Sequence, residues 1–66
     1  MFPNVRAEMA RLNYNIATLA QKADMKYSTL QTKLKGERSF TIEEAIRVKV
    51  ALKTDMVIEE LFSKED

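Results

Sequence analysis

The 66-residue chain contains no cysteine and no histidine. Without cysteine it can form neither a disulfide framework nor a thiolate metal site. Without histidine it lacks the usual general base, the usual zinc ligand and the side chain that most often changes charge near neutral pH. Because no acid, base or phosphate-binding loop converges elsewhere in the sequence, we expect no enzymatic activity, no metal ion and no other cofactor.

Glycine and proline occur only once each, and no apolar run approaches the roughly 20 residues that a membrane-spanning helix needs. No signal-peptide pattern opens the sequence. A chain with many good helix formers and so few helix breakers is typical of an all-α protein. We therefore expect one small cytoplasmic all-α domain over residues 1–66, which buries only about 60% of its unfolded surface.

Charge is distributed unevenly along the chain, although the net charge is only +1. Residues 21–38 carry five basic and two acidic side chains, whereas residues 55–66 carry five acidic and one basic. A basic middle and an acidic tail suit a protein that turns one face toward phosphate groups. Ordinary solvated helix surfaces would give the same pattern, so charge alone does not decide between the two interpretations.

Hydrophobic spacing predicts five helices, at residues 5–12, 16–23, 27–35, 42–52 and 58–63. We expect Asn4 and Asn15 to cap the first two, and Thr41 with Glu44 to form a capping box on the fourth. Asp24 falls at the left-handed position of a short turn, and Gly36 is expected to end the third helix. In the fourth helix the residues expected to point inward, or to lie beside those that do, are Ala45, Val48, Leu52, Ile42 and Ile46.

The segment from Asn15 to Gly36, NIATLAQKADMKYSTLQTKLKG, is the most informative part of the sequence. Its first half repeats apolar residues at i, i+3, i+4 and i+7, and its second half has leucines at i and i+4. Only three or four residues remain between the halves for a turn. The outward positions of the second half are polar or amphipathic, and none is acidic. This arrangement is typical of a helix-turn-helix that places its second helix in the DNA major groove.

From Val5 to Phe62 the chain resembles the phage repressor/Cro-type (XRE-like) helix-turn-helix DNA-binding domain. The segments that carry the resemblance are NIATLAQKA, YSTLQTKLKGERSF, TIEEAIRVKVAL and IEELF. The resemblance implies a compact five-helix bundle of the lambda-repressor-like type and a homodimer on a two-fold symmetric operator in double-stranded DNA. It also implies a small transcriptional regulator, such as a phage repressor, a mobile-element regulator or an antitoxin.

The resemblance also assigns roles by position. Base readout falls on residues 27–35, at Tyr27, Ser28, Gln31 and Thr32. Gln31 is the strongest candidate, because a glutamine donates and accepts in one plane and so matches the edge of adenine. The residues assigned to DNA phosphate are Asn15, Thr18, Lys26, Lys35, Gly36 and Arg38, with Lys22 and Lys33 as further candidates. Met56, Val57 and Phe62 are interpreted either as dimer contacts or as core.

The sequence departs from the family at the edges of the motif. Ile16 stands where a polar, phosphate-binding residue is usual, and Lys26 replaces the usual Ser or Thr cap of the third helix. Met9 and Leu34 occupy the positions of a common ion pair, so we expect an apolar contact there. Lys49 stands where a small inward residue is usual and Val50 where an outward charge is usual, and an exposed Val50 could serve a partner surface. The low net charge keeps open the alternative of a helical protein-interaction module, such as an antitoxin-like partner binder with weak DNA affinity.

Overall fold

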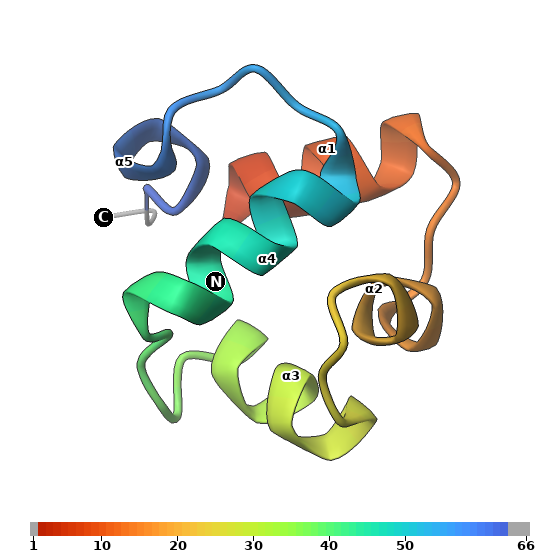
Figure 1. The fold of residues 1–66 in the computed structure, drawn as a ribbon, viewed down its shortest axis with the longest axis vertical. Helices are drawn as coiled ribbons and strands as arrows, with labels where there is room; N and C mark the ends of the chain where they lie inside the picture. The colour runs from red at the N-terminus through yellow and green to blue at the C-terminus, as the bar shows by residue number, and fades with distance from the viewer. Residues whose placement is uncertain (1, 64–66) are drawn as a thin grey trace.

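The structure is a computed structural model that describes residues 2–63. These residues form five helices and no strand, which confirms the predicted all-α class. The helices are α1 (Pro3–Arg11), α2 (Ile16–Lys22), α3 (Tyr27–Leu34), α4 (Ile42–Leu52) and α5 (Ile58–Leu61) (Figure 1). None of these helices combines the length and the apolar character needed to cross a membrane.

Helix α4 crosses the centre of the molecule, with α3 below it and α5 above it in Figure 1. Helix α2 packs against both α3 and α4, and α5 packs against α4 and α1. The side chains that fill the space between the helices are apolar and come from all five of them. The largest fully buried ones are Val5, Leu19, Leu30, Val48, Leu52 and Leu61. Met9 and Leu34, for which an apolar contact was expected, both belong to this core.

Three phenylalanine rings close the bundle where distant parts of the chain meet. Phe2 precedes α1, Phe40 lies before α4 and Phe62 follows α5. The ring centroid of Phe2 lies 5.5 Å from those of Phe40 and Phe62, and the latter two are 4.9 Å apart. Edge-to-face and tilted ring pairs of this kind each contribute about 0.5–1.5 kcal/mol beyond the burial of their surface. The cluster therefore joins the start, the middle and the end of the described chain.

Two of the three predicted helix caps are confirmed. The Asn15 side-chain oxygen accepts a hydrogen bond from the backbone N–H of Thr18 at 2.8 Å. Thr41 and Glu44 form the capping box that begins α4, with bonds of 2.9 and 3.1 Å. Each such cap satisfies backbone N–H groups that have no partner within the helix.

The predicted Asn4 cap is wrong, because α1 begins earlier than the apolar spacing indicates. Phe2 is the N-cap residue and Pro3 is the first residue of the helix, where its fixed φ angle suits the helical turn. Asn4 therefore lies inside α1, and its side-chain N–H donates to the carbonyl oxygen of Glu60 at 2.7 Å. Asn4 thus connects α1 to α5.

The expectation for α4 is only partly correct. Ala45, Val48 and Leu52 are buried, whereas Ile42 and Ile46 are 74% and 48% exposed. Apolar residues in this helix cover more than one face, and a single face is all that the core can bury. Val50 is 70% exposed.

Candidate nucleic-acid interface

Helices α2 and α3 pack against each other, and two small residues at the end of α2 are buried in the core. Ala20 and Ala23 are 3% and 2% exposed. In the turn, the backbone N–H of Met25 donates to the carbonyl of Ala20 at 2.9 Å, and Asp24 adopts a left-handed φ of 57°. The predicted short turn at Asp24 is thus confirmed, and it fixes the direction in which α3 leaves α2.

Helix α3 begins without a side-chain cap. Its N-cap residue, Lys26, makes no side-chain hydrogen bond to the first turn. A lysine has donors only and cannot accept from a backbone N–H, so the absence of the usual Ser or Thr has the expected consequence. The start of α3 is therefore fixed by the turn and by packing.

One face of α3 points away from the core and carries the four side chains assigned to base readout. Tyr27 is 49% exposed and Ser28 is exposed, whereas Gln31 and Thr32 are half-buried. Their spacing of i, i+1, i+4 and i+5 places them on neighbouring turns of one surface. We call this surface, Tyr27, Ser28, Gln31 and Thr32, the polar face of α3. None of the four belongs to the core.

The polar face continues into a shallow hollow of about 330 Å³, lined by Ser28, Thr29, Thr32, Lys33 and Arg38. Thr32 donates its hydroxyl proton to the carbonyl of Ser28 at 2.8 Å, so its oxygen serves an outside molecule only as an acceptor. Sequence reasoning missed Thr29, although its place three positions before Thr32 puts it at the border of the same surface.

The residues assigned to phosphate contacts lie at the start of α2, in the turn before α3 and after the end of α3. Lys26, Lys35, Gly36 and Arg38 are all exposed. At the start of α2, the Asn15 side-chain oxygen accepts from both the backbone N–H and the hydroxyl of Thr18, at 2.8 and 2.9 Å. These two side chains therefore stabilise the start of α2, and the Asn15 amide nitrogen remains as a donor for an outside molecule.

Lys33 does not lie with the exposed cations. It is only 9% exposed and forms an ion pair with Glu44 in the first turn of α4. The expectation that Lys33 contacts phosphate is therefore wrong. Its position three residues after Leu30 places it on the inward side of α3, and this spacing was the signal that could have revealed the pairing. The ion pair connects α3 to α4 and so fixes the orientation of the polar face.

Glu44 has a pKa below its ordinary value of 4.5. The main cause is the hydrogen bond from the Lys33 side chain, and the backbone N–H of Thr41 adds to it, while partial burial acts in the opposite direction. Because the folded-state pKa is lowered, the ionised carboxylate stabilises the folded chain above the pKa of the unfolded state. This stabilisation is lost as the pH falls through the folded-state pKa.

We expect Glu44→Gln to lower stability near neutral pH and to flatten the loss of stability in acid, because the variant has no carboxylate to protonate. Urea unfolding midpoints measured from neutral pH down to about pH 3 check this. The matched control is Glu43→Gln, since Glu43 lies in the same helical turn but forms an exposed ion pair with Arg47. If Glu43→Gln reduces the dependence of stability on pH in acid as much as Glu44→Gln does, the assignment of this dependence to Glu44 is contradicted.

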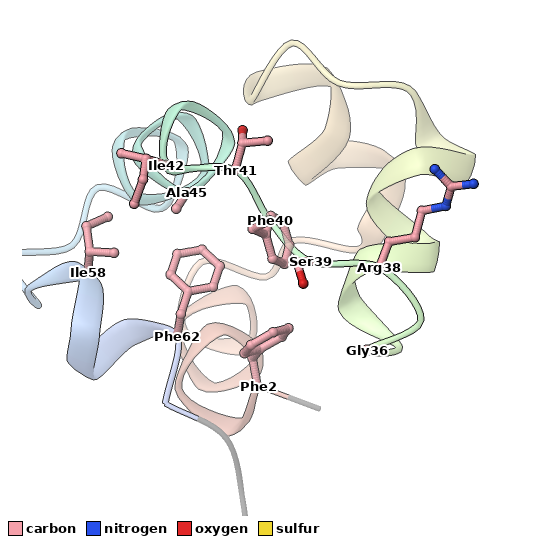
Figure 2. Close-up of a pocket in the computed structure, with 10 residues that line it drawn as sticks. All are labelled: Phe2, Gly36, Arg38, Ser39, Phe40, Thr41, Ile42, Ala45, Ile58 and Phe62. Carbon is pink, nitrogen blue, oxygen red and sulfur yellow. The ribbon is translucent and has the colours of Figure 1, made fainter.

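The three residues considered as dimer contacts differ in their surroundings. Val57 is 60% exposed at the start of α5. Met56 and Phe62 are half-buried against the core, and Phe62 contacts Phe2 and Phe40. These three rings line a pocket of about 220 Å³ together with Ile42 and Ile58. Figure 2 shows the side chains that line this pocket. Of the three residues, Val57 offers the most free apolar surface.

Acidic side chains do not gather into a metal site in the part of the chain that the structure describes. The side chains assigned to the interface offer hydroxyls, a phenol, cations and the two carboxamides of Asn15 and Gln31. These groups bind by hydrogen bonding and charge, as a nucleic acid requires. Comparisons with protein-family models, with curated proteins and with solved structures gave no match to the chain.

Proposed function

We propose that the chain is a lambda-repressor-like helix-turn-helix protein that binds duplex DNA with α3 in the major groove. The observation that carries the proposal is the polar face of α3, which holds Gln31 beside three hydroxyl groups and no acidic residue. A glutamine can donate to and accept from adenine in one plane. The hydroxyls of Tyr27 and Ser28 can donate to bases or phosphates, whereas the Thr32 oxygen can only accept. The ion pair between Lys33 and Glu44 supports the proposal, because it orients this face without using a residue from it.

Exposed cations at both ends of α3 support phosphate contacts on either side of the groove. Lys26 precedes the helix, and Lys35 and Arg38 follow it. The neighbouring exposed acids Asp24 and Glu37 offset part of this charge. We therefore propose that non-specific attraction to DNA is modest and that base contacts contribute much of the affinity for the right sequence.

The proposal includes a homodimer on a two-fold symmetric operator, which regulates transcription by occupying a promoter. It assigns the chain no catalytic step, because the sequence has neither histidine nor cysteine. A protein-interaction module is the second candidate function. It is favoured by the exposed apolar residues of α4, which are large and close together.

Selection of bound duplexes from a random pool tests the proposal. We expect enrichment of one sequence in two inverted copies, with half-site centres about one helical turn, or roughly 10 base pairs, apart. A parallel selection without protein gives the background. If the chain enriches no sequence and binds no duplex at low salt, where non-specific attraction is strongest, the interaction module replaces DNA binding.

A further inference from the structure

Helix α4 carries a line of exposed apolar side chains along its outer surface. Ile42, Ile46 and Val50 are 74%, 48% and 70% exposed. Their spacing of four residues places them one above another, and we call them the outer stripe of α4. They are three of the five large apolar residues that are exposed within residues 2–63.

The opposite side of α4 is already used, because Ala45, Val48, Ala51 and Leu52 are buried in the core. A helix that is apolar on two sides is usually covered on both. Contiguous exposed apolar surface with charged neighbours is typical of a protein–protein contact. Exposed Glu43 and Arg47 lie beside the outer stripe, and Lys49 is half-buried near it.

We propose that the outer stripe of α4 is covered by the outer stripe of a second copy of this chain, antiparallel and with a two-fold axis at Ile46. Reversal about Ile46 exchanges Ile42 with Val50, so the stripe is complementary to itself, as a two-fold interface requires. The inference rests on the proposed function in one respect, since it locates the dimer contact of that DNA-binding protein.

The charges beside the stripe fit a second copy in this orientation. Glu43 and Arg47 lie on one side of the stripe, and within one copy the Arg47 Nη2 atom is 2.6 Å from the Glu43 Oε1 atom. A two-fold axis across the helices brings this side against the same side of the second copy, where each Glu43 meets the other copy's Arg47. The result is a neutral group of four charges at the rim, which favours this pairing over mismatched partners.

Single-cysteine variants test the contact without DNA. Since the chain has no cysteine, Ile46→Cys and Val57→Cys each carry one thiol at an exposed apolar position. A disulfide forms only when the two Cα atoms come within about 7 Å. We expect mild oxidation to cross-link most of Ile46→Cys and little of Val57→Cys. Cross-linking of Val57→Cys equal to or greater than that of Ile46→Cys would overturn the proposal.

Two further mixtures test the orientation and the symmetry. Ile42→Cys mixed with Val50→Cys is expected to give a mixed disulfide in preference to either homodimer, whereas a parallel pair would give the homodimers. Ile46→Lys and Ile46→Glu are each expected to raise the dimer dissociation constant at least about 30-fold, because each new charge meets itself. Their equimolar mixture is expected to associate again.

Sedimentation measures association, and circular dichroism checks that each variant remains folded. A wild-type chain that stays monomeric at its highest soluble concentration overturns the pairing, as does an Ile46→Lys variant that associates like the wild type. Failure of DNA binding is a separate result. A chain that cross-links through Ile46→Cys but selects no duplex retains the α4 contact and loses the proposed function.

Discussion

Leu30→Ala is expected to lower the free energy of unfolding by about 2–5 kcal/mol. Leu30 is fully buried in the middle of α3, in the core cluster that includes residues of α2 and α4. Removing three carbon atoms there loses apolar burial and leaves a cavity that the neighbouring helices close only partly. A chain of 66 residues has a total stability of about 3–10 kcal/mol. The variant is therefore expected to lose a large fraction of its total stability.

Urea denaturation followed by helical circular dichroism gives this free energy. Val57→Ala is the matched control, because it also shortens an apolar side chain but at a 60% exposed position. The control is expected to change stability by about 0.5 kcal/mol or less. A Leu30→Ala variant as stable as this control would mean that α3 is not part of the cooperative core.

Gln31→Ala is expected to weaken binding to the selected operator by about 5- to 150-fold for each half-site, which corresponds to about 1–3 kcal/mol of base discrimination. Binding to an unrelated duplex should change little, because phosphate contacts carry that affinity. Lys35→Ala is expected to weaken both duplexes alike and to reduce the slope of log affinity against log salt by about 0.9 for the phosphate contact that it removes.

Fluorescence anisotropy with both duplexes over a range of salt concentrations separates these outcomes. Gln21→Ala is the matched control, because Gln21 is an exposed glutamine on α2, outside the polar face of α3. Equal losses on the two duplexes after Gln31→Ala would contradict base readout by Gln31. Such a result would leave Gln31 as a general contributor to affinity.

The helices could be predicted from sequence because their signals are local. Apolar spacing and caps such as Asn15 and the Thr41–Glu44 box depend on residues three or four apart, and the predicted ends differ from the observed ones by at most two residues. The polar face of α3 follows from the same periodicity. The first helix is the instructive exception, because Pro3 extends it past the residue that was expected to cap it.

Features that depend on packing between distant residues could not be predicted. The pairing of Lys33 with Glu44 joins two helices, and the contact of Phe2 with Phe40 and Phe62 spans most of the chain. The spacing from Leu30 indicates that Lys33 lies on the inward side of α3, but it does not indicate which carboxylate Lys33 meets. The exposure of Ile42 has a similar origin, since composition does not reveal which of two apolar sides of α4 the core will take.

The left-handed residues at the helix ends show how a chain with one glycine makes its turns. Asn13, Asp24 and Lys53 have φ angles of 58°, 57° and 52°. Left-handed backbone costs an ordinary residue about 1–2 kcal/mol, and less for Asn or Asp. Glycine would remove that strain but would give the unfolded chain more conformational entropy, worth about 0.4–1 kcal/mol at each position. The two effects largely offset each other, so the helix ends keep their side chains with little loss of stability.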